Sequence, residues 1–269
     1  MSLPYTQADG RAPSAKQLAA RAALLESVGF EVIAQGDHIG SSTRVTPDGL
    51  TWLAIAASAT TRCWIASGII QVPLRHPTEL AHRLLSMHAL SEGRFVAGLG
   101  AGSTRSDYDA VGADYERRFA TLGDALPRIR AELRGESQLK PWAGSGDGPP
   151  MLIGAWTSGR WVRKAAREYD GWMGSGAGHA SFRELCEGLR VFRDNGGKRS
   201  MLMTVSVDLQ ARRRLTETEP FSLTCEPAEA SDWLHRLADI GFDDVCLQKF
   251  GHTETDLPEE ALRELRALL

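Results

Sequence analysis

Residues 62–102 constrain the fold of this chain more than any other stretch. An apolar, β-branched run at 64–70 predicts a buried strand. Pro77 suits the first turn of a helix, and apolar residues from Leu80 to Leu90 follow it at helical spacing. Residues 95–99 form a second apolar run of strand length. A strand, a helix and a strand joined by short loops predict a parallel βαβ unit with a right-handed crossover.

Both predicted strands end in loops that contain glycine, at Ser67-Gly68 and in the GLGAG run at 98–102. Open loops at the carboxyl ends of parallel strands are where α/β proteins bind ligands. The GLGAG run is not a good dinucleotide fingerprint, because it lies in mid-chain and lacks the third glycine at the required spacing. We therefore expect a ligand site at this edge of the sheet, of a kind that this run alone does not define.

The same alternation continues through the rest of the chain. Further strands are predicted at 1–5, 30–34, 151–154, 171–175, 201–207 and 244–248, the first of them cut short at its front. Helices are predicted between Ser14 and Gly29 and at 50–60, 114–134, 158–168, 182–193, 227–240 and 258–268. Eight strands alternating with eight helices predict an α/β fold, a single-domain (β/α)8 TIM barrel over residues 1–269. An open, doubly wound sheet is the competing architecture.

Net charge, cysteine spacing and the length of apolar runs limit the partners and the cell compartment expected for this chain. The formal net charge of −3 argues against nucleic acid or an anionic membrane as the main partner. The four cysteines lie far apart and form no CxxC pair, which is typical of buried thiols in a reducing compartment. Neither a signal peptide nor an 18-residue apolar run is found, so we expect a cytoplasmic protein.

Two short motifs could carry chemistry. Asp37-His38 follows the second predicted strand, where a histidine could move a proton or bind a cofactor ring, or only bind the backbone of its own loop. After the fifth strand, Thr157, Ser158 and Arg160 open a helix whose free N–H groups suit an anion or phosphate. An ordinary helix cap is the alternative there. No His, Cys or carboxylate spacing typical of a metal site is present, so we predict no metal.

Several stretches together carry a resemblance to a known family. They are GFEVIAQGDH, LTWLAIAASATTR, SGIIQVPLRHPTELA, LSEGRFVAGLGAG, YDAVGADYERR and PMLIGAWTSGRWVRKAAREYDGW. Over nearly the whole chain they resemble the bacterial luciferase-like monooxygenase superfamily. The resemblance implies a TIM barrel that binds FMN or the deazaflavin coenzyme F420. It also implies either hydride transfer or oxygen-dependent monooxygenation of a small-molecule substrate, and we expect a homodimer.

The resemblance further implies the roles of individual residues. Asp37 and His38 would face the cofactor, with His38 as the catalytic residue. Gly68-Ile69 matches the bulged or non-prolyl cis position of the third strand and would support the tricyclic ring. The ring and its ribityl chain would be lined by Gln71, Gly102, Ser103 and Ser106. The phosphate would be bound by Thr157, Ser158, Arg160 and Trp161.

Departures from the family pattern keep a second hypothesis open. In the sugar-phosphate dehydrogenases of the family an acidic residue stands just after the GLGAG-type motif, where this chain has Ser103. The leading hypothesis is a flavin- or F420-dependent oxidoreductase in which His38 protonates or polarises the substrate. The alternative is a non-catalytic flavin-binding or partner subunit of the same fold. A metal-dependent barrel hydrolase ranks below both, because the sequence lacks its ligands.

Overall fold

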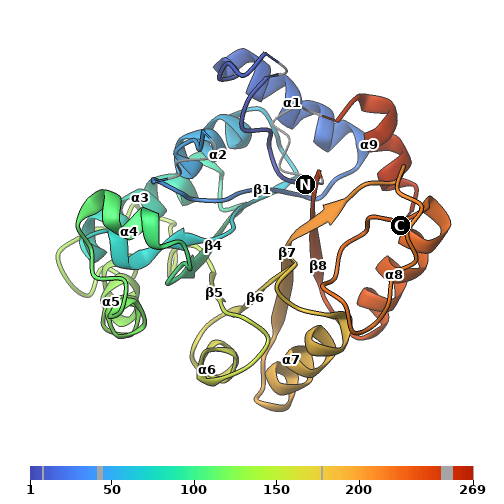
Figure 1. The fold of residues 1–269 in the computed structure, drawn as a ribbon. Coiled ribbons are helices and arrows are strands. Elements are labelled where there is room, and N and C mark those ends of the chain that lie inside the picture. The colour runs from blue at the N-terminus through green and yellow to red at the C-terminus, as the bar shows by residue number, and fades with distance from the viewer. Residues whose placement is uncertain (8, 41–44, 177, 250–256, 269) are drawn as a thin grey trace.

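The computed structural model describes residues 1–7, 9–40, 45–176, 178–249 and 257–268. Helices and strands alternate through these residues (Figure 1). The strands are β1 (Val32–Gln35), β2 (Trp64–Ser67), β3 (Ile70–Gln71), β4 (Phe95–Gly100), β5 (Met151–Gly154), β6 (Gly171–Ser175), β7 (Arg199–Val207) and β8 (Asp244–Lys249). The α-helices are α1 (Ala15–Val28), α2 (Gly49–Ser58), α3 (Pro77–Leu90), α4 (Arg105–Val111), α5 (Arg118–Leu133), α6 (Arg160–Glu168), α7 (Phe182–Asp194), α8 (Pro227–Asp239) and α9 (Glu259–Arg266). A 3-10 helix, η1 (Val72–Leu74), follows β3.

The strands form one parallel sheet that closes into a barrel. Their order is β1-β2-β4-β5-β6-β7-β8, and β3 also pairs with β4. The N-terminal segment completes the ring: the Ser2 N–H donates to the Leu247 carbonyl of β8 (3.1 Å), and the Leu3 N–H donates to the Ala34 carbonyl of β1 (3.4 Å). The helices surround the sheet in Figure 1. The predicted (β/α)8 barrel is therefore confirmed, although the strand expected at 1–5 makes only an isolated bridge between Ser2 and Ala34.

Several predicted element boundaries were wrong. The strand expected at 64–70 is divided into β2 and β3 by Gly68 and Ile69, whose peptide bond is cis. The helix expected at 114–134 begins only at Arg118, because the Asp114 carboxylate accepts from the N–H groups of Glu116 (2.9 Å) and Arg117 (3.2 Å) and forms a turn there. The short helix α4 just before it was not predicted.

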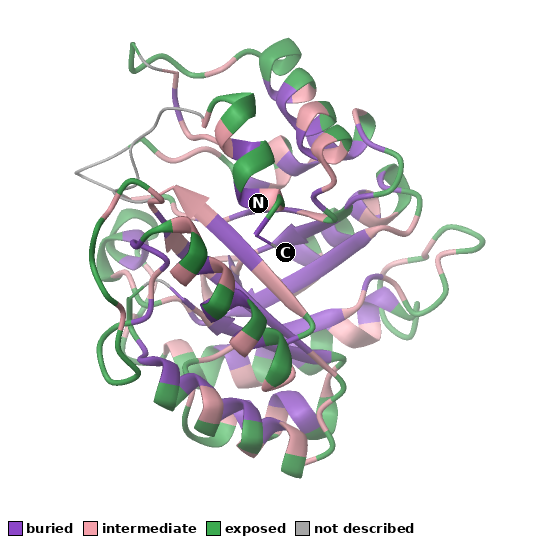
Figure 2. Ribbon diagram, turned by 90° about the vertical axis from the view of Figure 1, so that its right-hand side faces the viewer, coloured by how far each residue is buried: buried purple, intermediate pink, exposed green. Residues whose placement is uncertain are grey.

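Alternation along the strands divides the apolar side chains between two layers. One cluster takes members from every long strand and fills the barrel interior: Ala34, Ala66, Val96, Leu152, Met173, Met201, Met203 and Cys246. Their neighbours along the strands, such as Ile33, Ile65 and Ile153, belong to the larger cluster between the sheet and the helices. Most of the sheet in the middle of Figure 2 is buried, and exposed residues lie on the outer faces of the helices. The interior is thus a packed core rather than a pore.

Strand β7 contains a bulge near its carboxyl end. Leu202 pairs with Val245 of β8, but Val205 pairs with Leu247, so two residues of β7 face one residue of β8. Within this bulge Thr204 has a φ of 61°, a left-handed conformation that is rare for a β-branched residue. A side chain in that region costs about 1–2 kcal/mol relative to the usual backbone.

We expect Thr204→Gly to be more stable than Thr204→Ala by about 1 kcal/mol, because only glycine adopts a positive φ without a Cβ clash. This is the reverse of the usual order in a strand, where glycine is the less stable of the two. The free energy of unfolding in urea measures the difference. The same pair of substitutions at Ser206, two residues along β7, is the control and should show the usual order. A Thr204→Ala variant at least as stable as Thr204→Gly would contradict this reading of the bulge.

Candidate active site

Polar side chains from three elements meet at the carboxyl end of the barrel. Asp37 and His38 follow β1, Gln71 ends β3, and Asp107 lies in α4, which follows β4. Parallel strands bring all their carboxyl ends to one edge of the sheet, so residues that are 36 to 69 positions apart in sequence form hydrogen bonds here. This group is the candidate active site.

Asp107 is the centre of the group. Its side chain is completely buried. One carboxylate oxygen accepts from the N–H groups of Ile39 (2.9 Å) and Gly40 (2.7 Å). The other lies 2.6 Å from Gln71 Nε2 and 2.7 Å from His38 Nδ1. Burial opposes ionisation, but the hydrogen bonds from Gln71, His38 and the two backbone groups together lower the pKa of the Asp107 carboxyl below its usual value.

An ionised Asp107 determines which nitrogen of His38 carries a proton. A carboxylate can only accept hydrogen bonds, so the Nδ1 atom of His38 must be the donor. The Nε2 atom is then an acceptor in the neutral ring and a donor in the charged ring. The His38 side chain remains 28% exposed, whereas the Asp107 side chain is completely buried. His38 can therefore exchange a proton with a molecule in the mouth of the barrel.

Asp37 has a different set of partners. Its carboxylate forms an ion pair with Arg75 (2.7 Å) and accepts from the Gln71 N–H (3.1 Å), and its carbonyl accepts from Gln71 Nε2 (2.8 Å). Arg75 also donates to the Gln71 carbonyl (3.2 Å). Both charged side chains are mostly buried, so this pair connects the loop after β1 to the turn after β3. Asp37 thereby supports the position of His38.

The floor of the mouth is apolar. The Ile69 side chain lies against Gly100 and Gly154, and a Cβ at Gly154 would come within 2.7 Å of it. Gly68 is covered by the Met203 side chain, which leaves no room for a Cβ. Ile69 and Met203 therefore close the interior beneath the polar group, next to the predicted ring-supporting Gly68-Ile69 bond.

The loop after β4 packs tightly on its neighbours. Gly102 has a φ of 73°, and a Cβ there would collide with the Gln71 side chain. The Ser103 carbonyl accepts from the Tyr115 hydroxyl (3.0 Å). The Ser106 carbonyl lies so close to Gly40 that a side chain on Gly40 would not fit. The predicted residues Gly102 and Ser106 thus adjoin the Asp107 group, while Ser103 is exposed beside it.

The predicted phosphate residues lie after β5. Helix α6 begins at Arg160 and not at the expected Ser158, because Gly159 precedes it with a φ of 99°. Thr157 packs against Gly188 of α7, where a Cβ would come within 2.7 Å of its carbonyl. The Arg160 guanidinium lies 5.7 Å from the ring of Trp161. Among the described residues, no hydrogen bond or ion pair joins this stretch to His38. The Ile69 side chain packs against Gly154, the last residue of β5.

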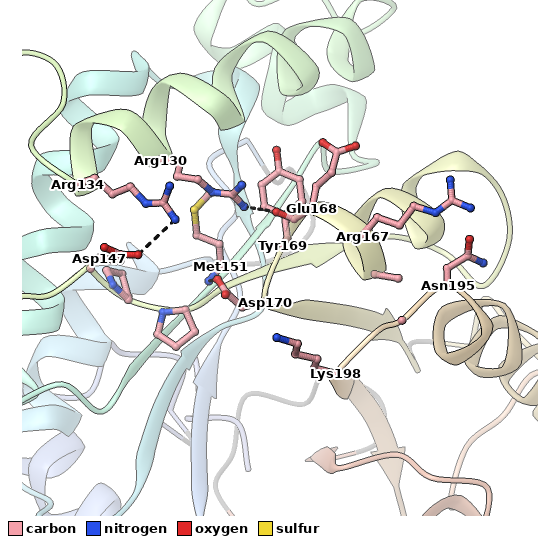
Figure 3. Close-up of a pocket in the computed structure, with 15 residues that line it drawn as sticks. Arg130, Arg134, Asp147, Met151, Arg167, Glu168, Tyr169, Asp170, Asn195 and Lys198 are labelled. Atoms are coloured by element: carbon pink, nitrogen blue, oxygen red, sulfur yellow. Dashed lines mark hydrogen bonds and ion pairs between the residues drawn. The ribbon is translucent and has the colours of Figure 1, made fainter.

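A hollow of about 590 Å³ lies at the opposite end of the barrel (Figure 3). Met151, Asp170 and Lys198, which stand at or just before the beginnings of β5, β6 and β7, line it together with residues from the ends of the neighbouring helices. Two of its three arginines have structural partners: Arg134 pairs with Asp147 (3.3 Å), and Arg130 donates to the Glu168 carbonyl (2.5 Å). The third, Arg167, lies in the last turn of α6. Cations at helix C-termini stabilise the helices. We therefore do not place the active site there.

Other site types find no support in the described part of the chain. No three His, Cys, Asp or Glu residues there are grouped so that they could hold a metal ion. None of the described helices is long and apolar enough to cross a membrane. Cys63, Cys186, Cys225 and Cys246 are all free, and burial raises the pKa of the Cys63 and Cys225 thiols to about 11. These thiols are packing residues rather than nucleophiles.

Asp107 and Arg75 were not identified from the sequence as site residues. Asp107 follows the GLGAG run by five residues, and Arg75 follows β3 by four, so both lie at the edge of the sheet that was expected to bind a ligand. An acidic residue soon after a glycine-rich loop was the available signal for Asp107. The sequence could not show that its partner would be His38.

Comparison with known proteins is consistent with this geometry. A sequence model of the luciferase-like monooxygenase family matches residues 1–248. The F420-dependent glucose-6-phosphate dehydrogenase of Kribbella flavida is 26% identical over 91% of this chain and 82% of its own length. Matches to three other curated relatives span only 29% to 38% of the length of those proteins.

Solved structures show the same fold. Monooxygenase RslO1 from Streptomyces bottropensis superposes with a TM-score of 0.78 at 18% identity, covering 100% of this chain and 96% of that one. The oxygenating constituent of 3,6-diketocamphane monooxygenase from Pseudomonas putida, solved in complex with FMN, gives a TM-score of 0.74 at 14% identity over 98% and 97% of the two chains.

Asp107→Asn should lower the free energy of unfolding at pH 7 by about 2 kcal/mol or more, because an amide nitrogen would face buried donors. In the wild type, the pKa of the Asp107 carboxyl is lower in the folded chain than in the unfolded chain. The stability that the ionised carboxylate contributes is therefore complete above about pH 4, and it is lost as the pH falls through the folded-state pKa. Urea unfolding at a series of pH values measures both effects. The free energy of unfolding of the variant should fall less than that of the wild type as the pH is lowered. The same pH dependence in both proteins would contradict the assignment of Asp107 as an ionised, buried acceptor.

Proposed function

This chain belongs to the luciferase-like monooxygenase family, and on that basis we propose that it is an oxidoreductase dependent on reduced coenzyme F420 or FMN. It would carry out hydride transfer to, or monooxygenation of, a small organic substrate. The single observation that carries the proposal is His38, held by a buried carboxylate at the carboxyl end of the barrel and still open to the mouth. The Kribbella relative is named for F420, and the diketocamphane enzyme was solved with FMN.

The residues present fit a flavin-like ring. The Gln71 side chain is buried, and its Oε1 atom has no hydrogen-bond partner among the described residues. A buried acceptor without a donor is costly, and the rings of FMN and F420 both carry an N–H group that could satisfy it. Gly68, Ile69, Gln71, Gly102, Ser103 and Ser106 would hold the ring and ribityl chain, and Thr157, Ser158, Arg160 and Trp161 the phosphate. When bound, the reduced cofactor would supply the hydride or react with oxygen.

The role of the protein would be to orient the substrate and move a proton. Asp107 and Gln71 fix the ring plane and the protonated nitrogen of His38. In the protonated ring, His38 Nε2 would donate a hydrogen bond or a proton to the substrate oxygen as charge develops on it. The buried Asp37–Arg75 pair would keep the loop in place during this transfer.

A second candidate function is a non-catalytic, cofactor-binding subunit of the same fold. The observation that favours it is Ser103, an exposed hydroxyl where the sugar-phosphate dehydrogenases have a carboxylate. Such a subunit would bind FMN or F420 but would turn over no substrate. Titration with each cofactor, followed by an assay for oxidation of the reduced form, separates the two candidates.

Three broader features belong to the same proposal. Residues 1–269 would act as one barrel domain, as a homodimer and in the cytoplasm. The net charge of −3 and the free cysteines are consistent with a cytoplasmic setting. The mass in solution, measured by light scattering, tests the dimer.

His38→Ala should reduce turnover by about 10²–10⁴-fold, the usual contribution of a general acid or base, while changing cofactor affinity little. Steady-state rates and a cofactor titration measure the two quantities separately. His82→Ala, which removes an exposed imidazole from α3, is the control and should leave both unchanged. Unchanged turnover in His38→Ala would exclude the acid role.

Arg160→Ala should weaken FMN binding by about 10- to 100-fold, since a hydrogen bond to a charged group contributes about 1.5–3 kcal/mol. Riboflavin, which has no phosphate, should bind the wild type and the variant almost equally. Fluorescence titration measures both ligands. Arg163→Ala, on the same helix, is the matched control and should bind FMN normally. Equal weakening of riboflavin and FMN would mean that Arg160 is only structural.

A further inference from the structure

The bulge in β7 changes which side chains face into the barrel. Met201 and Met203 belong to the interior cluster, so regular alternation would also turn residues 205 and 207 inward. Val205 and Val207 instead belong to the cluster between the sheet and the helices. The extra residue at Thr204 has therefore reversed the alternation. Ser206, which lies between the two outward valines, faces the interior.

Ser206 stands in the mouth of the barrel, above the apolar floor. It follows Met203, which covers Gly68, and it is paired in register with Gln248 of β8. Its backbone carbonyl accepts from the Leu223 N–H (2.7 Å). Its hydroxyl forms no hydrogen bond to any described residue, and the side chain is partly exposed. An inward hydroxyl at this level is therefore available to a ligand.

The neighbouring inward positions are also polar and neutral. Ser175 follows the interior residue Met173 by two positions in β6, and Gln248 follows the interior residue Cys246 by two positions in β8. The residues expected to bind the cofactor come from β1 to β5 and the loops that follow them. The arc from β6 to β8 is thus left for the second reactant. Among the described residues, the inward positions of this arc would therefore offer a charged group hydroxyl and amide groups rather than a counter-ion.

We propose that Ser206, with Ser175 and Gln248 beside it, binds a neutral oxygen function of the substrate, a carbonyl or a hydroxyl group. The inference rests on the proposed function, because it places the substrate in the same mouth as His38. A serine hydroxyl both donates and accepts, so it can pair with either oxygen function. The bulge at Thr204 is the feature that turns this hydroxyl inward.

The test uses four probes with the same six-membered ring: cyclohexanone, cyclohexanol, methylcyclohexane and cyclohexanecarboxylate. Their binding to the full chain saturated with FMN or F420 is measured by saturation-transfer NMR. The ketone and the alcohol should bind more tightly than the hydrocarbon and the carboxylate. Ser206→Ala should weaken binding of these two about three- to tenfold and leave methylcyclohexane unchanged. Ser222→Ala, which removes a partly exposed hydroxyl bonded to Thr224, is the matched control.

Two results would overturn the inference. One is a wild-type chain that binds the ketone and the alcohol no better than the hydrocarbon. The other is a Ser206→Ala variant that binds all four probes as the wild type does, or weakens them all equally. If the cofactor binds but the preference is absent, this inference fails and the proposed function stands. If neither cofactor binds, the proposed function fails, and the same probes with the cofactor-free chain still decide the role of Ser206.

Discussion

The buried carboxylate of Asp107 is the interaction on which the mouth of this barrel depends. It receives four hydrogen bonds, two from the backbone of the loop after β1, one from Gln71 and one from His38. An ionised group without water around it is tolerated only when its acceptors are satisfied in this way. Three separate segments must therefore adopt one arrangement together. Loss of any donor leaves the charge under-solvated, which makes the arrangement well defined.

Close packing without side chains is the second constraint. Gly68, Gly100 and Gly154 each lie against Ile69 or Met203, and a Cβ at any of them would crowd its neighbour. The interior cluster can thus reach the level of the cis peptide and form an apolar floor there. The polar side chains of the site lie on the mouth side of this floor, and tightly packed apolar side chains lie beneath it. His38, which belongs to the polar group, stays 28% exposed and therefore accessible to a ligand.

The spacing of apolar residues along the sequence correctly predicted most of the strands and helices and the barrel. Apolar runs gave the parallel strands and the barrel, and Asp37 and His38 were expected at the rim where the structure places them. It did not reveal the bulge at Thr204, because one extra residue in a long apolar strand leaves no periodic signal. Asp107 was missed for a related reason, since a charged residue in a loop is usually solvated and only tertiary contacts make it a buried acceptor. Helix α4 is too short to be separated from loop by pattern alone.

The arrangement of the site favours an enzyme over a passive subunit. The other three donors to the Asp107 carboxylate are two backbone N–H groups and the Gln71 amide, none of which exchanges a proton near neutral pH. Adding His38 fixes the imidazole by one nitrogen and leaves the other free for a ligand, which a purely structural contact does not require. The reversed alternation of β7 also leaves a polar group open to a ligand, because it turns the Ser206 hydroxyl inward where regular alternation would place a valine. This arrangement requires Thr204 to adopt an unfavourable left-handed backbone conformation. His38 and Ser206 are thus two polar groups that packing alone does not require, and they face the same mouth from different arcs of the barrel. This is the arrangement expected where a reaction takes place between them.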